Sequence, residues 1–278
     1  MGISVSSVTR ALKVDLKLKP FHKFKSSKMT DEHVRNRMKS AEILLNTYGG
    51  TRRSKEFLWH SIINSDYSAK IGLNPLNNTR NDVVYGTSRE SIPRLLLESP
   101  REQFIKGFMV WGTISGRGLI PKNGPIFIDE FLNEYEWPHD KKRTMNAERY
   151  IDLLQEKIIP SIENLYTDDD YIYQDDCDSI HRAASVIEFI EENMPNRIPP
   201  EYQAPKLDDV WPIENVWSII RTELKKKDYE NSNAMKQEVV KIWRDFDTDL
   251  CAEMMSSIPK RLQAVLDKGG RRILKSDY

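Results

Sequence analysis

The sequence has few cysteines and no long apolar run. Two cysteines, Cys177 and Cys251, occur in 278 residues, far apart and without the spacing of metal ligands. A chain of this length can bury a core without disulfide bonds, so we expect a reducing, intracellular compartment. No stretch approaches the roughly 18 uninterrupted apolar residues of a membrane-spanning helix. Asp15 and several lysines interrupt the apolar runs near the N-terminus, which excludes a secretory signal. We therefore expect no membrane partner.

A net charge is also absent. The 42 Lys and Arg residues balance the 42 Asp and Glu residues, so the chain as a whole shows no preference for a polyanionic partner. Residues 1–55 nevertheless hold 13 basic and 4 acidic residues, which leaves 29 basic and 38 acidic residues for the remainder. Such a basic arm can contact phosphates, and a solvated basic helix face explains the same surplus equally well.

The residues that are present indicate a folded α/β protein. Hydrophobic residues make up 39% and charged residues 30% of the chain, and there are six tryptophans, as in an ordinary globular protein. Apolar patterning predicts strands over 57–66, 82–86, 106–115, 124–129 and 171–174. It predicts helices over 5–16, 31–48, 146–162, 181–193, 213–227, 233–246 and 251–268, with 114–124 as a hairpin connection. Antiparallel strands followed by strand–helix alternation favour a mixed sheet with helices on its faces.

Three acidic residues stand out by their position. Asp66 ends the first strand, Asp176 follows the strand at 171–174, and Glu214 lies in the first turn of a helix that Pro212 introduces. Strand ends and a helix start can present three carboxylates to one point, where hard oxygen ligands suit Mg²⁺ or Mn²⁺. Without a metal, one of these carboxylates would take up a proton. Because charged residues are abundant, many other sets of three acidic residues could be chosen, and position alone does not select this one.

Five sequence words carry a family resemblance. In chain order they are HSIINSD, FMVWGTIS, YIYQDDCDSIHRA, WPIENVW and IPKRLQAVLDKGG. Together they resemble the catalytic domain of mariner-type (Tc/mariner superfamily) cut-and-paste DNA transposases, over about residues 4–274. The resemblance implies an α/β, ribonuclease-H-like fold with a mixed five-stranded sheet flanked by helices. It further implies two Mg²⁺ or Mn²⁺ ions, transposon-end and target DNA as partners, a homodimer and a nuclear location.

The resemblance also implies which residues form the catalytic and metal-binding triad. The family's first Asp follows a Ser at a strand end and matches Asp66. Its second Asp precedes a His by five residues and matches Asp176 with His181, which makes Asp175 a neighbour and not a ligand. Its third acid, in the word Pro-Ile-Glu-Asn, matches Glu214. Two metal ions at such a triad can activate a water or a 3′-hydroxyl for phosphodiester chemistry.

The chain departs from the family pattern around the triad and at its N-terminal end. Tyr67 stands where the family usually has Glu, residues 177–179 replace Asn-Ala-Pro, and Trp211 replaces an Asn before the third acid. Of the family's two helix-turn-helix modules, residues 4–21 resemble only the end of the second. We therefore expect residues 1–55 to be a basic remnant of the DNA-binding region and residues 56–278 to be the catalytic domain. The whole resembles a shortened or decayed copy, or a host gene derived from one.

The basic arm supplies the expected DNA contacts. Four of its side chains are expected to hold backbone phosphates without reading sequence: Arg10, Lys13, Lys23 and Lys25.

Three hypotheses follow for the activity. The first is a two-metal transposase, the second a domesticated, catalytically silent DNA-binding or protein-interaction module, and the third a metal-dependent nuclease without strand transfer.

Several neighbouring residues have simpler interpretations. Asp175 and Asp178 are expected in a solvated acidic turn, and Cys177 is either a chance substitution or a redox-sensitive thiol. His181 lies either near the metals or at a helix cap or on the surface. Three tryptophans are expected in the core: Trp111, Trp217 and Trp243.

Overall fold

The computed structural model describes most of the chain in two compact units, Met1–Thr30 and Asp31–Tyr278. The described residues are Ser7 and residues 10–16, 29–50, 57–72, 107–139, 142–167, 170–194 and 196–278. Among the described residues of the first unit, the π-helical segment η1 (Ala11–Asp15) lies within the helix expected over residues 5–16. The strand expected over residues 82–86 lies outside the described residues. No helix formed by the described part of the chain is long and apolar enough to cross a membrane.

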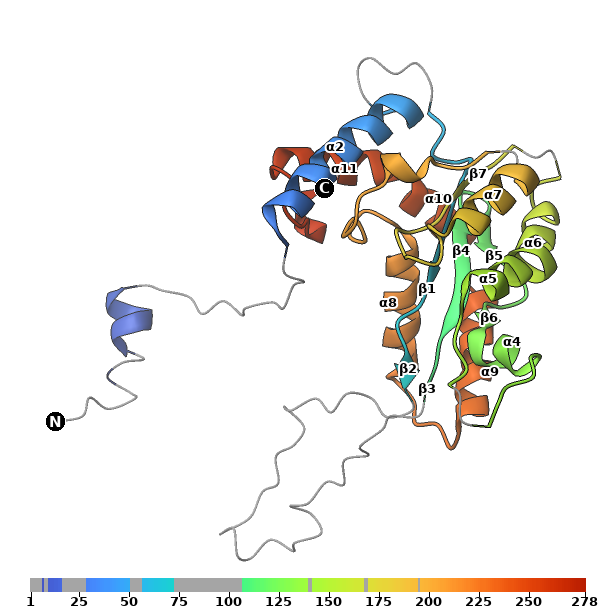
Figure 1. Ribbon diagram of the computed structural model, residues 1–278. Helices are drawn as coiled ribbons and strands as arrows, with labels where there is room; N and C mark the ends of the chain where they lie inside the picture. Colours follow the sequence, from blue (N-terminus) through green and yellow to red (C-terminus); the bar gives the residue numbers. More distant parts are fainter. Residues whose placement is uncertain are drawn as a thin grey trace, which may run out of the picture. The chain divides into compact units, whose positions relative to one another are not determined.

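A mixed five-stranded sheet forms the centre of the second unit (Figure 1). Its strands are β1 (Ile62–Tyr67), β4 (Val110–Ser115), β5 (Gly118–Ile120), β6 (Ile126–Phe127) and β7 (Ile172–Gln174). Their order is β5-β4-β1-β7, and β6 also pairs with β4. Strand β1 runs antiparallel to β4, with Asp66 opposite Gly112, and parallel to β7, with Asn64 opposite Gln174. The strands β2 (Ile71–Gly72) and β3 (Gly107–Phe108) form a separate small antiparallel pair.

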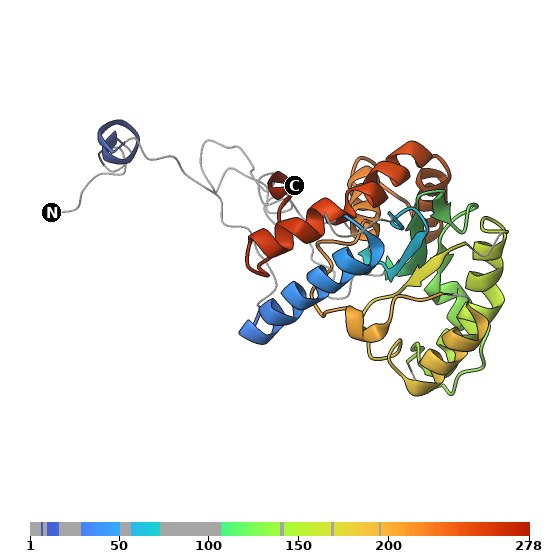
Figure 2. The same cartoon turned by 90° about the horizontal axis from the view of Figure 1, so that it is seen from above.

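Helices cover both faces of the sheet. Adjacent residues Ile62 and Ile63 of β1 are both fully buried, but they belong to two different apolar clusters, because successive strand residues point to opposite faces. Val110 and Trp111 of β4 divide in the same way. Figure 2 shows the strands between the orange and red helices of the C-terminal part and the green and yellow helices. These observations confirm the expected mixed sheet flanked by helices.

The helices follow the expected order with one addition, a helix that begins at Ile128 inside the strand expected over residues 124–129. Their bounds are α2 (Asp31–Tyr48), α4 (Ile128–Asn133), α5 (Ala147–Leu153), α6 (Ile159–Glu163), α7 (Ala184–Asn193), α8 (Ile213–Leu224), α9 (Ser232–Arg244), α10 (Thr248–Ser256) and α11 (Ile258–Asp267). Three short elements complete the order: the π-helical η2 (Leu154–Ile158), and the 3-10 turns η3 (Pro200–Tyr202) and η4 (Lys275–Asp277). Helix α2 begins with Asp31 and Glu32, which favour the positive N-terminal end of the dipole.

Three expected elements differ in detail. The helix expected over residues 251–268 is two helices, α10 and α11, because Pro259 lacks an N–H group and occupies the first turn of a new helix. The expected hairpin connection over residues 114–124 contains strand β5, which pairs with β4. The helix expected over residues 146–162 is present as α5, η2 and α6 in succession.

Helix α2 belongs to the larger unit. It was expected in the basic arm, but it packs against α11, and the compact unit begins at Asp31 and not at residue 56. Arg37 is fully buried there and binds Asp209 through two hydrogen bonds, Nη1–Oδ1 at 2.7 Å and Nη2–Oδ2 at 2.8 Å. Its Nε donates to the carbonyl of Gly270 at 2.9 Å. Helix α2 is thus tied to the loop that leads to α8.

Candidate functional site

The three expected acids line one cavity, which we call the acid cavity. Its volume is about 300 Å³, and Asp66, Asp176 and Glu214 are all among its lining residues. Asp66 comes from β1, Asp176 from the turn after β7, and Glu214 from the first turn of α8. Since β1 and β7 are parallel neighbours, their carboxyl ends lie at the same edge of the sheet, and α8 begins beside that edge.

Asn64 holds the three elements together. Its Nδ2 donates to Oε1 of Gln174 on β7 at 2.5 Å, and its Oδ1 accepts from the backbone N–H of Ile213 at 2.9 Å. One buried amide therefore joins β1, β7 and the start of α8, immediately beside the acids. Sequence analysis did not select Asn64 or Gln174, although a polar residue inside an otherwise apolar strand is the signal that could have identified each.

Asp66 lies in a largely desolvated position beside two other acids. Burial, followed by the charges of Glu214 and Asp176, raises the pKa of Asp66 to about 8. The backbone N–H of Tyr67 and the indole of Trp217 oppose this pKa shift. Nε1 of Trp217 donates to Oδ2 of Asp66 at 3.3 Å. The cavity therefore disfavours the charged form of Asp66.

Asp176 is stabilised in its charged form. Burial would raise its pKa, but the hydrogen bond and charge of His181 outweigh burial and lower the pKa of Asp176. Nδ1 of His181 lies 2.6 Å from Oδ1 of Asp176, and the backbone N–H of Asp178 donates to the same oxygen at 3.0 Å. The His181 ring is 1% exposed and stacks on Tyr150 with ring centroids 4.3 Å apart. Of the interpretations open for His181, the structure therefore supports the one beside the triad and excludes a surface position.

Glu214 has a further acidic neighbour in the cavity. Burial and then the charge of Asp208 raise the pKa of Glu214, while Arg221 and Arg272 lower it. Asp208 also lines the acid cavity and forms an ion pair with Arg272. Sequence analysis did not select Asp208, because its position in the loop before α8 resembles no family acid.

The expected acidic turn is only partly solvated. Asp178 is exposed, as expected. The expectation for Asp175 is wrong, because its side chain is fully buried and its Oδ2 lies 2.5 Å from Nη2 of Arg197. Burial raises the pKa of Cys177, which keeps the thiol protonated and favours a chance substitution over a redox-sensitive thiol.

The three tryptophans are buried, as expected. Trp217 has a second role that the core pattern did not reveal, because its Nε1 contacts Asp66.

The expected phosphate contacts lie in the N-terminal unit. Arg10 is exposed beside η1. The side chain of Lys13, and all of Lys23 and Lys25, lie outside the described residues. The DNA contacts of all four stay a prediction.

The donor set of the acid cavity suits a hard divalent cation. Carboxylate oxygens are the ligands that Mg²⁺ and Mn²⁺ prefer. The raised pKa of Asp66 shows that its charged form is disfavoured in the metal-free cavity, and a bound cation would stabilise that charged form. As they stand, no three His, Cys, Asp or Glu side chains of the described residues form a group that could hold a metal ion. Binding would therefore require the carboxylates to turn toward one another.

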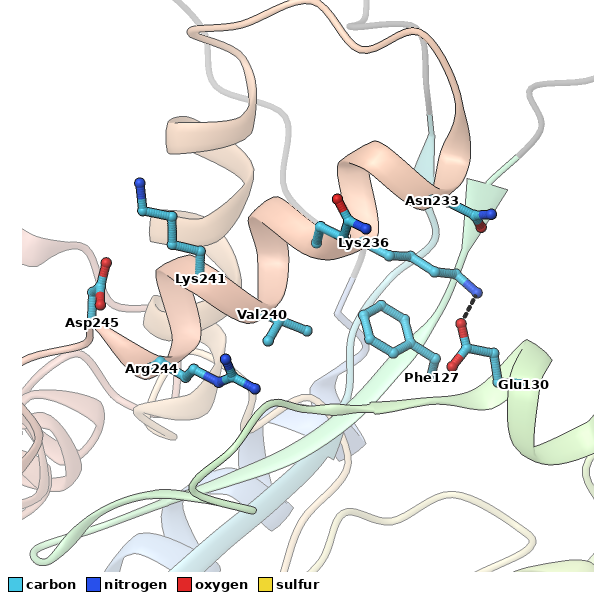
Figure 3. Close-up of a pocket in the computed structure, with 9 residues that line it drawn as sticks. Phe127, Glu130, Asn233, Lys236, Val240, Lys241, Arg244 and Asp245 are labelled. Carbon is cyan, nitrogen blue, oxygen red and sulfur yellow. Dashed lines mark hydrogen bonds and ion pairs between the residues drawn. The ribbon is translucent and has the colours of Figure 1, made fainter.

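A larger cavity of about 770 Å³ lies along α9, away from the acids (Figure 3). Lys236, Lys241 and Arg244 line it together with Glu130 and Asp245. Nζ of Lys236 is already paired with Oε1 of Glu130 at 2.7 Å and with Oδ2 of Asp129 at 2.6 Å. The charges that line this α9 cavity are nearly balanced, and the described residues that line it include no acidic cluster. We therefore take the acid cavity as the candidate functional site.

Comparison with known protein sequences finds similarity to a transposase. No family model matches the sequence. The Transposable element Tcb2 transposase of Caenorhabditis briggsae is 22% identical over 162 residues, which are 58% of this chain and 52% of that protein. The chain thus spans about half the length of this curated relative.

Comparison with solved structures identifies the fold. The Mos1 transposase paired-end complex with left transposon end matches with a TM-score of 0.73 and 17% identity, over 98% of this chain and 72% of that chain. The catalytic domain of Mos1 mariner transposase matches with a TM-score of 0.64 and 15% identity, over 90% of this chain and all of that domain. These matches confirm the α/β, ribonuclease-H-like fold, and together with the sequence match they confirm the resemblance to mariner-type transposases.

Proposed function

We propose that this chain is the catalytic part of a mariner-type DNA transposase that cleaves and joins phosphodiesters with two Mg²⁺ or Mn²⁺ ions. The observation that carries the proposal is the acid cavity. Asp66, Asp176 and Glu214 all line it, and the pKa of Asp66 is raised to about 8 there. The Tcb2 relative is a transposase, and the similar structures include a Mos1 paired end complex with Mn and a Mos1 catalytic domain with Mg. These names support divalent metal use by this chain.

Each acid has a distinct part in the proposed site. Asp66 and Asp176 would share the two ions, and Glu214 would complete the shell of one. When bound, such ions activate a water or a 3′-hydroxyl as nucleophile and stabilise the leaving oxygen. Asp66 would bind a cation in its charged form, and the indole of Trp217 orients its Oδ2. His181 and the Asp178 N–H both contact Oδ1 of Asp176 and hold its carboxylate at the cavity.

DNA is the proposed substrate. The similar Mos1 structure is described as a paired-end complex with left transposon end, which supports transposon-end binding by this chain. Arg10, Lys13, Lys23 and Lys25 would hold backbone phosphates. A homodimer and a nuclear location belong to the same proposal.

Two observations favour a second candidate function. The acidic side chains of the described residues do not form a metal-holding group as they stand, and Trp211 lines the acid cavity where the resembled family has a small Asn. A domesticated, catalytically silent module that binds DNA or another protein would have both features.

A plasmid-nicking and strand-transfer assay in Mn²⁺ separates these functions. The parent chain is expected to nick supercoiled DNA and to join a 3′-hydroxyl end to it. Asp176→Asn should lower the rate by about 1,000-fold or more, since metal binding supplies several kcal/mol to the transition state. Glu253→Gln, an exposed change on α10, is the control and should act as the parent does. Nicked DNA without joined products would favour the nuclease hypothesis, and activity that survives Asp176→Asn would contradict two-metal cleavage at this site.

A further inference from the structure

The turn that carries Asp176 has little regular structure to hold it. We call Asp175–His181 the acid loop; it connects the end of β7 to the turn before α7. Its residues 175–178 are neither helix nor strand. Its local hydrogen bonds include those from the N–H of Asp178 to Oδ1 of Asp176 and from the N–H of Ile180 to Oδ1 of Asp178. These contacts shape the loop but do not attach it to the rest of the unit.

Arg197 makes that attachment from a neighbouring segment. Its backbone lies beside β7, where the N–H of Tyr173 donates to the carbonyl of Asn196 at 3.0 Å and the N–H of Ile198 donates to the carbonyl of Tyr173 at 2.9 Å. Its side chain is 6% exposed, and Nη2 reaches Oδ2 of Asp175 at 2.5 Å. The same nitrogen donates to the carbonyl of His181 at 3.3 Å. One guanidinium group therefore contacts the first and the last residue of the acid loop.

The buried ion pair of Arg197 with Asp175 is better suited to orienting the acid loop than to stabilising the fold. Taking a carboxylate and a guanidinium out of water costs most of what their attraction returns, so apolar replacements of both often fold as well or better. The planar guanidinium holds its donors in fixed directions, whereas the ammonium of a lysine rotates on a flexible stem. Arg182, the other cation near Asp175, has its Nη1 4.0 Å from Oδ1 and makes a weaker contact.

We propose that Arg197 is a positioning residue for the metal site: by holding Asp175 and His181 together, it fixes Asp176 at the acid cavity. With the loop ends held, Nδ1 of His181 stays 2.6 Å from Oδ1 of Asp176. The His181 ring also stacks on Tyr150, which packs it against α5. The inference rests on the proposed function in one respect, namely that Asp176 is a metal ligand.

The test uses the full chain with three variants. Asp175→Leu/Arg197→Met replaces the pair by apolar groups, so it folds without leaving a buried charge. Arg197→Lys keeps the positive charge but replaces the planar guanidinium, whose donors have fixed directions, by a flexible ammonium. Lys236→Met is the matched control, because Lys236 is another buried cation paired with two carboxylates, and it does not line the acid cavity.

Amide hydrogen exchange of the metal-free chain measures directly how well the acid loop is held in place. We expect the N–H groups over residues 178–183 to exchange about tenfold faster or more in the double variant, with β1 unchanged and with Lys236→Met equal to the parent. Mn²⁺ calorimetry should then show affinity weakened about 10- to 100-fold in the double variant and less in Arg197→Lys. Unchanged loop exchange in the double variant would overturn the inference. If the parent binds no Mn²⁺, the proposed function fails, and the exchange result still decides whether Arg197 positions the loop.

Discussion

Trp217 contacts the first acid of the triad directly: its indole Nε1 donates a hydrogen bond to Oδ2 of Asp66 over 3.3 Å. The same indole stacks on Trp243 with ring centroids 5.6 Å apart. Trp243 in turn lies so close to Gly112 that a Cβ atom there would come within 2.3 Å of the ring. A rigid aromatic pair thus supports Asp66 from the core, and it places a fluorescent group at the acid cavity.

Trp217→Phe should weaken metal binding while keeping the apolar ring. Because the indole hydrogen bond lowers the pKa of Asp66, its loss should raise that pKa further and reduce Mn²⁺ affinity by about tenfold. Calorimetry checks the change. Trp111→Phe is the control, since Trp111 is buried in the other apolar cluster and does not line the acid cavity. Equal affinities for the two variants would contradict the orienting role.

The stability of the metal-free chain should fall as the pH rises from about 4 to about 8. The pKa of Asp66 is about 8 when folded against an ordinary value of 3.8, so over this range the folded state binds more protons than the unfolded state. The free energy of unfolding should then decrease by up to about 1.4 kcal/mol per pH unit. Asp66→Asn, which cannot ionise, should lose most of this slope and should be more stable than the parent at pH 8.

Urea unfolding at several pH values without metal measures this effect. Glu191→Gln, an exposed change on α7, is the control and should leave the slope as in the parent. Parallel curves for the parent and Asp66→Asn would show that Asp66 is not protonated in the folded chain.

Metal binding should release a proton. Below about pH 8 Asp66 holds a proton that a bound cation must displace, so Mn²⁺ affinity should increase by about tenfold per pH unit up to that pH. Calorimetry at pH 6.5 in buffers of different ionisation enthalpy counts the protons, and we expect about one. A heat of binding that is independent of the buffer would exclude Asp66 as the titrating ligand.

Arg37→Met should strongly destabilise the larger unit. The substitution leaves Asp209 buried and without its bidentate partner, which costs about 3–5 kcal/mol in comparable buried pairs. Urea unfolding measures the loss. Lys226→Ala removes an exposed pair with Glu223 and should change stability by less than about 0.5 kcal/mol. A similar small loss for both would show that α2 is not fixed by Arg37.

The sequence predicted the elements that follow from periodicity and from strand ends. Asp66, Asp176 and Glu214 each stand where a strand ends or a helix begins, and the parallel pairing of β1 with β7 brings such positions to one edge. The mixed α/β class followed from apolar alternation and helical stripes, which set the order of the elements, whereas the ribonuclease-H-like fold was implied by the family resemblance.

Long-range pairings were not predictable from local pattern. Asp175 resembles a member of a solvated acidic run, and its burial depends on Arg197, 22 residues further along the chain. Trp217 fits a helical apolar stripe, which hides the polar contact of its Nε1. Strand β5 has three residues, too few for an alternation to be recognised. Helix α2 carries basic residues typical of an arm, and its packing depends on Arg37 meeting Asp209, 172 residues away.

The central claim is that the acid cavity binds divalent metal ions through the triad. A calorimetric Mn²⁺ titration of the parent chain with a short DNA duplex present, beside Asp66→Asn, Asp176→Asn and the control Glu253→Gln, tests it most directly. We predict that the parent and Glu253→Gln bind Mn²⁺ and that both triad substitutions abolish binding. Equal binding by all four proteins, or no binding by the parent, would contradict the metal centre.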